Sequence, residues 1–352
     1  MKDVLFIRAD GNGDIGLGHI MRSMTIASVF KDMGFECIYI SSAPINKKVF
    51  DRYDFKAIEI DYPYDNKSIK EACEICELIK QKEAKYILVD SYYINNEYLE
   101  QLKKYSSIIC INSTRYRLRT DFLINENIAC DRDYFDDLYS GSDTKLLLGS
   151  EYSPIRTEFC NRKYRMKNKV KKILVTTGGG DQYNFMTNFL KKISKKGKYG
   201  TLNFLFISGG CNVHYEDLVK ESNGLSNVII VNDADNMAEL MENSDLAISA
   251  GGTTVLELSV MGVPTIGIAV ADDQAAGLSF MHHIGMICYA GRITEPEFWN
   301  NVCAYFDLLL KDKETRKQLS EQSKKCIDGK GAGRIYHQIV KGWRENGDRK
   351  YS

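Results

Sequence analysis

The chain has 352 residues, of which 44% are hydrophobic and 27% charged, a globular composition too long for one ordinary core. Lysine plus arginine equals aspartate plus glutamate at 47 each, so the formal net charge is zero. This balance argues against nucleic acid or an anionic membrane as the main partner. The first apolar run starts at Val4 and no run reaches the length of a membrane span. We therefore expect no signal peptide, no membrane insertion and a cytoplasmic location.

The first predicted element is a strand, Val4–Arg8, which continues through Asp10 into a turn with four glycines between residues 11 and 18. Glycines let the backbone approach a ligand closely, and the free N–H groups and dipole of a helix start favour an anion. His19 opens the helix, and the positive dipole end favours its neutral, basic form. Arg22 follows one helical turn later. The turn is therefore predicted to bind an anion and to carry the proton-handling residue, His19.

Two other interpretations of this turn stay open. The spacing G-x-G-x-x-G over residues 11–16 also fits the dinucleotide-binding fingerprint, which needs an acidic residue at the end of the second strand. The second predicted strand, Glu36–Ser41, ends in serine and has its acid at the beginning. The other interpretation is a turn that only packs strand against helix, but packing does not require a histidine and an arginine one helical turn apart.

Apolar strands alternate with amphipathic helices almost from end to end, which predicts parallel sheets with crossover helices. A basic, polar segment, Arg162–Lys172, lacks apolar periodicity and is the expected linker. It divides the chain into an N-terminal Rossmann-like domain, residues 1–161, and a C-terminal one, residues 162–352, with a helical tail from Lys313 to Trp343. The last helix of this tail either stays with the C-terminal domain or packs back onto the first domain. The expected strands are Val4–Arg8, Glu36–Ser41, Lys56–Ile60, Tyr86–Asp90, Ile108–Asn112, Phe122–Asn125, Leu146–Leu148, Ile173–Thr177, Phe204–Ser208, Val228–Val231, Leu246–Ser249, Thr265–Ala269 and Ile287–Ala290.

Two glycine-rich turns of the second half also follow predicted strands. Gly178–Asp181 precedes a helix and forms one of them. In the other, a strand ends in two glycines, and Thr253 and Thr254 open a helix whose N–H groups and hydroxyls suit a diphosphate. Glu257 lies one turn into that helix, where a carboxylate can accept both hydroxyls of a ribose. A solvated glutamate on a helix face is the simpler alternative for Glu257.

Two further segments end strands of the second half. Asp272–Gln274 opens a helix and is placed to meet a sugar or a diphosphate, although acids in a first turn also balance the helix dipole without any function. Residues 232–237 follow a strand, a position at which backbone groups can meet a base.

No cluster of histidine and acidic residues has the spacing of metal ligands. His282 and His283 are adjacent on a predicted helix and point to different faces. Cys73 and Cys76 have C-x-x-C spacing but lie in an acidic predicted helix without a second pair nearby. We therefore expect neither a metal nor a cofactor.

Taken in order, these motifs resemble those of the UDP-2,4-diacetamido-2,4,6-trideoxy-altropyranose hydrolases of pseudaminic acid biosynthesis. That family has the two-domain GT-B fold and is related to the MurG glycosyltransferase. The resemblance covers most of the chain. The segments that carry it are Arg8–Asp10, Ile15–Arg22 with Thr25–Ala27, Val89–Tyr92, Leu148–Phe159, Thr177–Asp181 with Asn184, and Ile248–Gln274.

The resemblance implies an α/β protein of GT-B type, with two doubly wound Rossmann-like domains facing across a cleft. It also implies metal-independent hydrolysis of a UDP-sugar with inversion at the anomeric carbon, by a monomer or weak oligomer. His19 matches the histidine that activates or positions water, and the C-terminal domain holds UDP. The residues expected around the substrate are Arg8, Asp10, Gly16, Gly18, Arg22, Tyr92, Gly179, Asp181, Asn184, Asn236, Met237, Gly252, Thr253, Thr254, Glu257, Asp273 and Gln274.

The chain departs from the family pattern at two places in the N-terminal domain. Ser91 stands where the family commonly has a histidine, and Asn112–Ser113 stands where an acidic pair often follows the fifth strand. Three arginines between residues 115 and 119 come next. Two alternatives therefore stay open: a GT-B glycosyltransferase that uses the same UDP-sugar donor, with an acceptor hydroxyl in place of water, and a nucleotide-sugar-binding protein without catalysis.

Overall fold

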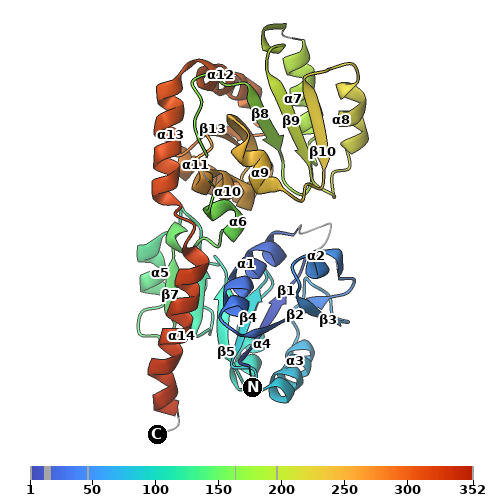
Figure 1. The fold of residues 1–352 in the computed structure, drawn as a ribbon. Helices are drawn as coiled ribbons and strands as arrows, with labels where there is room; N and C mark the ends of the chain where they lie inside the picture. Colours follow the sequence, from blue (N-terminus) through green and yellow to red (C-terminus); the bar gives the residue numbers. More distant parts are fainter. Residues whose placement is uncertain (1, 12–16, 46, 163, 196, 351–352) are drawn as a thin grey trace. The chain divides into compact units, whose positions relative to one another are not determined.

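The computed structural model describes residues 2–11, 17–45, 47–162, 164–195 and 197–350, which form two compact α/β units (Figure 1). Unit 1 comprises residues 1–154 and 330–352, and unit 2 comprises residues 155–329. This division differs from the expected one after residue 161. The expected linker belongs to unit 2, because Tyr164 and Val170 are buried there and Tyr164 donates a hydrogen bond to the backbone oxygen of Asp245.

Unit 1 is built on a seven-stranded parallel sheet in the order β3-β2-β1-β4-β5-β6-β7. Its strands are β1 (Val4–Ala9), β2 (Glu36–Ser42), β3 (Lys56–Ile60), β4 (Tyr86–Asp90), β5 (Ser107–Ile111), β6 (Phe122–Asn125) and β7 (Lys145–Leu148). Its helices are α1 (Gly18–Asp32), α2 (Lys47–Arg52), α3 (Ile69–Lys82), α4 (Asn96–Lys103), α5 (Arg132–Leu138), the short 3-10 helix η1 (Ser150–Tyr152) and α14 (Gly331–Lys350).

Apolar side chains of α3, α4 and α5 pack on one face of this sheet, and those of α1, α2 and α14 pack on the other. The C-terminal helix α14 therefore belongs to unit 1, which is the second of the two expected placements and differs from the expected range 162–352 of the C-terminal domain. Ile335 and Ile339 of α14 are fully buried, and the ring of Tyr336 lies 5.0 Å from that of Phe30 in α1. Burial of these side chains is the physical reason for the assignment.

Unit 2 contains a six-stranded parallel sheet in the order β10-β9-β8-β11-β12-β13. Its strands are β8 (Lys172–Thr176), β9 (Asn203–Ser208), β10 (Val228–Asn232), β11 (Leu246–Ala250), β12 (Thr265–Ala269) and β13 (Cys288–Arg292). Its helices are α6 (Thr157–Cys160), α7 (Phe185–Ser194), η2 (Gly197–Tyr199), α8 (Tyr215–Ser222), α9 (Met237–Glu242), α10 (Thr253–Met261), α11 (Asp272–His283), α12 (Phe298–Lys311) and α13 (Lys313–Cys326).

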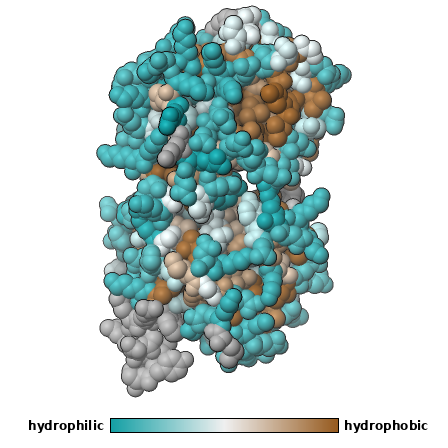
Figure 2. All heavy atoms as spheres, viewed as in Figure 1, coloured by the Kyte–Doolittle hydropathy of each residue, from teal (hydrophilic) through white to brown (hydrophobic). Residues whose placement is uncertain are grey.

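The surface of unit 2 is mostly hydrophilic, but a hydrophobic area lies over β9 and β10 (Figure 2). Ile229 of the edge strand β10 is 60% exposed. No helix of the described residues is long and apolar enough to cross a membrane.

All the expected strands are confirmed, and their ends differ from the expected ones by at most two residues. In both sheets the strand order reverses beside the first strand, between β1 and β4 in unit 1 and between β8 and β11 in unit 2. Ligands of doubly wound sheets bind at the carboxyl ends of strands at such a switch point. Asp10 directly follows β1, Asp90 ends β4, and the two glycine turns of the second half follow β8 and β11. The predicted motifs therefore lie where the topology places a ligand.

Candidate active site

His19 forms a short contact with a carboxylate that the fold brings beside it. The Nδ1 atom of His19 lies 2.6 Å from Oδ1 of Asp90, and both side chains are buried. Burial alone would raise the pKa of Asp90, but the charge and hydrogen bonds of Arg22, together with His19, hold that pKa below its usual range. Because Asp90 is ionised, the proton of this contact belongs to Nδ1, and Nε2 is left as the acceptor of the neutral ring.

Arg22 was expected to contact the substrate, but the structure turns its guanidinium toward protein carboxylates. Its Nε and Nη2 atoms lie 2.6 and 2.5 Å from Oδ2 and Oδ1 of Asp90, and Nη1 lies 2.8 Å from Glu126. Burial works to lower the pKa of Arg22, but Asp90 and Glu126 outweigh it and raise that pKa. Arg22 thus donates a bidentate pair of hydrogen bonds that fixes the orientation of the Asp90 carboxylate.

Arg8 also differs from its predicted role at the sugar. It is fully buried, and its guanidinium donates to Asp10 (2.5 Å), Glu71 (2.7 Å) and Ser42 (2.9 Å). These partners satisfy the guanidinium inside the protein, so Arg8 supports Asp10 and does not face a ligand.

Asp10 is held by charges on two sides. Its Oδ1 accepts from Arg8 and from the backbone N–H of Ser42 at 2.8 Å, and its Oδ2 accepts from Lys67 at 3.1 Å. Burial alone would raise the pKa of Asp10, but Arg8 and Lys67 lower it to about 2. Lys67 also donates to the backbone oxygen of Tyr64 at 2.8 Å, so it fixes two residues of the same pocket.

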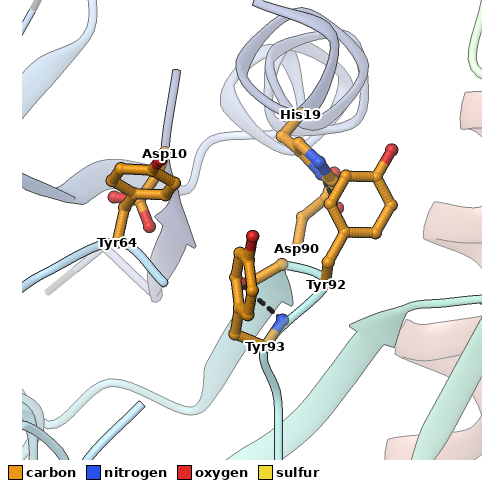
Figure 3. A pocket seen from close by; sticks show the side chains of 7 residues that line it. Asp10, His19, Tyr64, Asp90, Tyr92 and Tyr93 are labelled. Atoms are coloured by element: carbon orange, nitrogen blue, oxygen red, sulfur yellow. Dashed lines mark hydrogen bonds and ion pairs between the residues drawn. The ribbon is translucent and has the colours of Figure 1, made fainter. Parts of the chain in front are cut away.

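A pocket lies over these residues at the end of the sheet of unit 1 (Figure 3). Asp10 and Tyr64 lie on one side, His19, Asp90 and Tyr92 lie on the other, and Tyr93 rises between the two groups. The ring of Tyr92 meets that of His19 edge to face at 4.5 Å. The empty space over these side chains is about 180 Å³, below the ~300 Å³ of a typical ligand pocket.

The start of α1 lies next to this pocket. Gly18 is exposed, and a side chain there would meet nothing within 4 Å. Among the described residues, no side chain caps the first amides of α1. Gly16 and the centre of the glycine turn, residues 12–16, lie outside the described residues.

In unit 2, the turn after β8 carries one residue with a different role from the predicted one. Asp181 is buried, and its two carboxylate oxygens accept the backbone N–H groups of Phe185 and Met186 at 2.8 and 2.9 Å. The carboxylate of Asp181 therefore caps the start of α7. Gly179 is exposed, with open space where a side chain would stand. Asn184 has φ 52°, and its amide nitrogen contacts Asp217 of α8 at 3.4 Å.

The two glycines in the turn after β11 have different surroundings: one packs closely against α11, and the other borders open space. A Cβ on Gly251 would lie 2.7 Å from Leu278 of α11, whereas a Cβ on Gly252 would meet nothing within 4 Å. Gln274 was expected at the substrate, but its Oε1 accepts from the backbone N–H groups of Gly251 (3.3 Å) and Val270 (3.1 Å). Its amide oxygen thus joins the ends of β11 and β12.

The helix start after this turn keeps its amides available to a ligand. No side chain of the described residues caps the start of α10, where Thr253 is exposed and Thr254 half-buried. Asp273, in the first turn of α11, is exposed. Asn236 precedes α9 and donates to Glu239 at 3.2 Å, and Met237, the first residue of α9, is half-buried.

Glu257 is buried in α10 and paired with a residue that sequence reasoning did not assign. The Nε and Nη2 atoms of Arg156 each lie 2.8 Å from Oε1 of Glu257. Burial raises the pKa of Glu257, and the charge of Arg156 opposes that rise. The buried pair excludes the simpler alternative of a solvated helix-face glutamate.

Some hydrogen-bond partners of the predicted site residues were not assigned from the sequence, and they differ in whether the sequence held a signal for them. Asp90 ends the strand beside β1, so the switch point was a usable signal for its meeting with His19, 71 positions away. Lys67 and Glu126 gave no such signal, because a charged residue in a loop has the same appearance in sequence whether it faces solvent or a buried partner. Arg156 lies in the segment Leu148–Phe159 that carries the resemblance, but the sequence did not show that it pairs with Glu257.

Among the described residues, no group of three histidine, cysteine or acidic side chains is arranged to hold a metal ion.

Comparisons with known proteins agree with this architecture. Residues 172–283 match the glycosyltransferase family 28 C-terminal domain. The crystal structure of Acinetobacter baumannii MurG superposes with a TM-score of 0.65 at 14% identity, covering 97% of this chain and 100% of MurG. The expected fold class is confirmed: the protein has two parallel-sheet Rossmann-like units of the GT-B type.

Two curated relatives are more similar in sequence. An uncharacterised protein of Methanocaldococcus jannaschii is 26% identical over 281 residues, covering 74% of this chain and 54% of the relative, so the match spans about half of that protein. The UDP-2,4-diacetamido-2,4,6-trideoxy-beta-L-altropyranose hydrolase of Campylobacter jejuni is 25% identical over 280 residues, covering 79% of this chain and 95% of that enzyme. The chain is thus a distant homologue of that hydrolase.

Proposed function

We propose that the protein is a metal-independent UDP-sugar hydrolase that acts at the anomeric carbon with inversion. Its substrate resembles a UDP-2,4-diacetamido-2,4,6-trideoxyhexose of nonulosonic acid or surface-glycan biosynthesis. The observation that carries the proposal is the 2.6 Å contact between Nδ1 of His19 and Asp90 in the wall of the pocket. A histidine fixed in this way offers Nε2 as a general base.

In the proposed reaction, the oxygen of a water molecule bonds to the anomeric carbon while Nε2 of His19 accepts a proton from the water. The bond between that carbon and the diphosphate oxygen breaks, and its electron pair leaves with UDP. Attack from the side opposite the leaving group inverts the configuration. Asp90 stabilises the imidazolium that forms, and the amides at the start of α10 stabilise the diphosphate.

The other contacts of the two units fit this assignment. The rings of Tyr64, Tyr92 and Tyr93 offer aromatic faces to a sugar, and the ionised Asp10 accepts from a hydroxyl or acetamido N–H. In unit 2, the carboxylate of Glu257 is proposed to accept the hydroxyls of the ribose. The Campylobacter jejuni relative, named as a UDP-sugar hydrolase, supports the same reaction.

The second candidate is a glycosyltransferase with the same donor, in which an acceptor hydroxyl takes the place of water. The match of residues 172–283 to the glycosyltransferase family 28 C-terminal domain favours it.

The test is incubation of the full chain with a panel of UDP-sugars and no acceptor, followed by NMR of the released sugar. Hydrolysis predicts release of UDP and, as the first product, the anomer opposite to that of the substrate. Binding of a UDP-sugar without UDP release would contradict the hydrolase and support the transferase or a binding protein without catalysis.

A further inference from the structure

Arg156 and Glu257 form a buried ion pair whose geometry uses only one oxygen of the carboxylate. Arg156 lies just before α6, and its Nε and Nη2 atoms both reach Oε1 of Glu257 at 2.8 Å. Its third nitrogen, Nη1, lies 2.8 Å from Glu158. The side chain of Glu257 is 7% exposed, and that of Arg156 is 20% exposed.

This arrangement divides the two oxygens of Glu257 between two tasks. A carboxylate accepts about four hydrogen bonds, two on each oxygen. Arg156 fills both positions on Oε1, so the acceptor capacity of Oε2 remains for a ligand. The pair also controls charge, because burial favours the protonated form of Glu257 and the guanidinium favours the ionised form.

We infer that Arg156 is a positioning residue of the nucleotide site, which turns Glu257 so that Oε2 accepts the hydroxyls of a bound ribose. The inference rests on the proposed function, because it takes Glu257 as the ribose contact. Arg156 itself acts through Glu257 and does not touch the nucleotide.

The geometry makes a specific prediction for Glu257→Gln. Arg156 requires an acceptor at the Oε1 position, so the amide oxygen of the glutamine points there and the amide nitrogen replaces Oε2. The ribose then faces a donor in place of an acceptor. Glu257→Gln should therefore weaken UDP binding as much as Glu257→Ala does, by about 10- to 100-fold, the usual worth of a hydrogen bond to a charged group. A carboxylate that Arg156 did not orient would let the amide rotate and recover part of the binding.

The test is calorimetric titration of the full chain and its variants with UDP and with 2′-deoxy-UDP, at pH 6 and pH 8. We expect wild type to prefer UDP. We expect Arg156→Met to lose affinity for UDP and most of that preference. Its loss should be larger at pH 6, because removal of the guanidinium raises the pKa of Glu257 further, and Arg156 and Glu158 are the charged groups that interact with it. Arg156→Lys keeps the charge and should recover part of the affinity.

Arg162→Met is the matched control. Arg162 lies in the same stretch of chain, is 37% exposed and pairs with Glu242 at 3.0 Å. Its loss should leave both titrations unchanged.

The outcomes separate the inference from the proposed function. Absence of UDP binding by wild type overturns both. If wild type binds UDP and discriminates against 2′-deoxy-UDP, and Arg156→Met does the same at both pH values, only the inference is overturned. If Arg156→Met does not fold, Glu257→Gln decides: affinity near that of wild type overturns the inference, and affinity equal to that of Glu257→Ala supports it.

Discussion

Replacing Asp90 with asparagine should lower turnover by only about tenfold, because the carboxylate oxygen that faces His19 carries two of the three hydrogen bonds to Asp90 from His19 and Arg22. In wild type, Oδ1 of Asp90 accepts from His19 (2.6 Å) and from Nη2 of Arg22 (2.5 Å), and Oδ2 accepts from Nε of Arg22 (2.6 Å). An amide oxygen at the Oδ1 position keeps two of these three bonds. An amide nitrogen there would keep only the bond from Nε of Arg22, whereas the other orientation loses only that bond, and it would require the ring proton of His19 to move to Nε2. The oxygen therefore stays on His19, and Nε2 remains the base.

The expected loss is then that of the negative charge alone. A hydrogen bond to a charged group contributes about 1.5–3 kcal/mol and a neutral one about 0.5–1.5 kcal/mol. The difference of about 1–1.5 kcal/mol corresponds to a rate loss of about 5- to 13-fold. By comparison, a histidine held in the wrong tautomer loses about 10⁴-fold.

The measurement is kcat/KM for UDP release from a UDP-sugar that wild type hydrolyses, with thermal unfolding as the check on the fold. A loss near 10⁴-fold in a folded Asp90→Asn protein would show that the amide has rotated and would refute the reasoning. A loss within twofold would show that Asp90 does not assist His19. Adding Arg22→Met to Asp90→Asn frees the amide to rotate, so the double variant should lose more than the two single losses multiplied.

The remaining predictions concern His19, Asp10 and metal. His19→Asn should keep UDP affinity and lower turnover about 10²- to 10⁴-fold, the usual contribution of a general base; survival of turnover within threefold, or a loss confined to UDP affinity, would contradict its role. The pKa of Asp10 is depressed to about 2, so its stabilisation is present above about pH 4 and is lost as the pH falls toward 2. In the Asp10→Asn variant, the free energy of unfolding should therefore depend less on pH between about 4 and 2. An unchanged pH dependence would contradict the stabilising ion pairs of Asp10 with Arg8 and Lys67. Turnover should survive dialysis against a chelator; loss that a divalent ion restores would disprove the metal-independent mechanism.

The strands of both sheets were predictable because their sequences carry one strong physical signal. Parallel strands are covered on both faces, so they appear as short continuous apolar runs such as Leu246–Ala250, all of it buried. The same property fixes the position of the loops that follow them, which is why the two glycine turns after β8 and β11 were located correctly. The pattern says nothing about which sheet a terminal helix joins. The apolar residues of α14 mark an amphipathic helix, and only the structure shows that Ile335 and Ile339 are buried against unit 1.

The roles of charged residues near the turns were harder to predict. Arg8, Arg22 and Asp181 stand beside predicted binding motifs, and each has its polar atoms turned to protein partners. A guanidinium or carboxylate has the same appearance in sequence whether it binds a ligand or positions the group that does. The difference depends on partners far along the chain, such as Glu126, 104 positions from Arg22.

The buried charges beneath the pocket of unit 1 are better explained by positioning than by stability. Arg8, Lys67, Asp10 and Glu71 balance in charge, but removing two ion pairs from water costs about as much as their attraction returns. An apolar cluster of similar volume would stabilise the sheet at least as well. It would not present an ionised carboxylate at the pocket, because a buried Asp10 without Arg8 and Lys67 would take up a proton. The network therefore serves to hold one ionised hydrogen-bond acceptor, the carboxylate of Asp10, at the pocket. Arg22 positions Asp90 and Arg156 positions Glu257 in the same way.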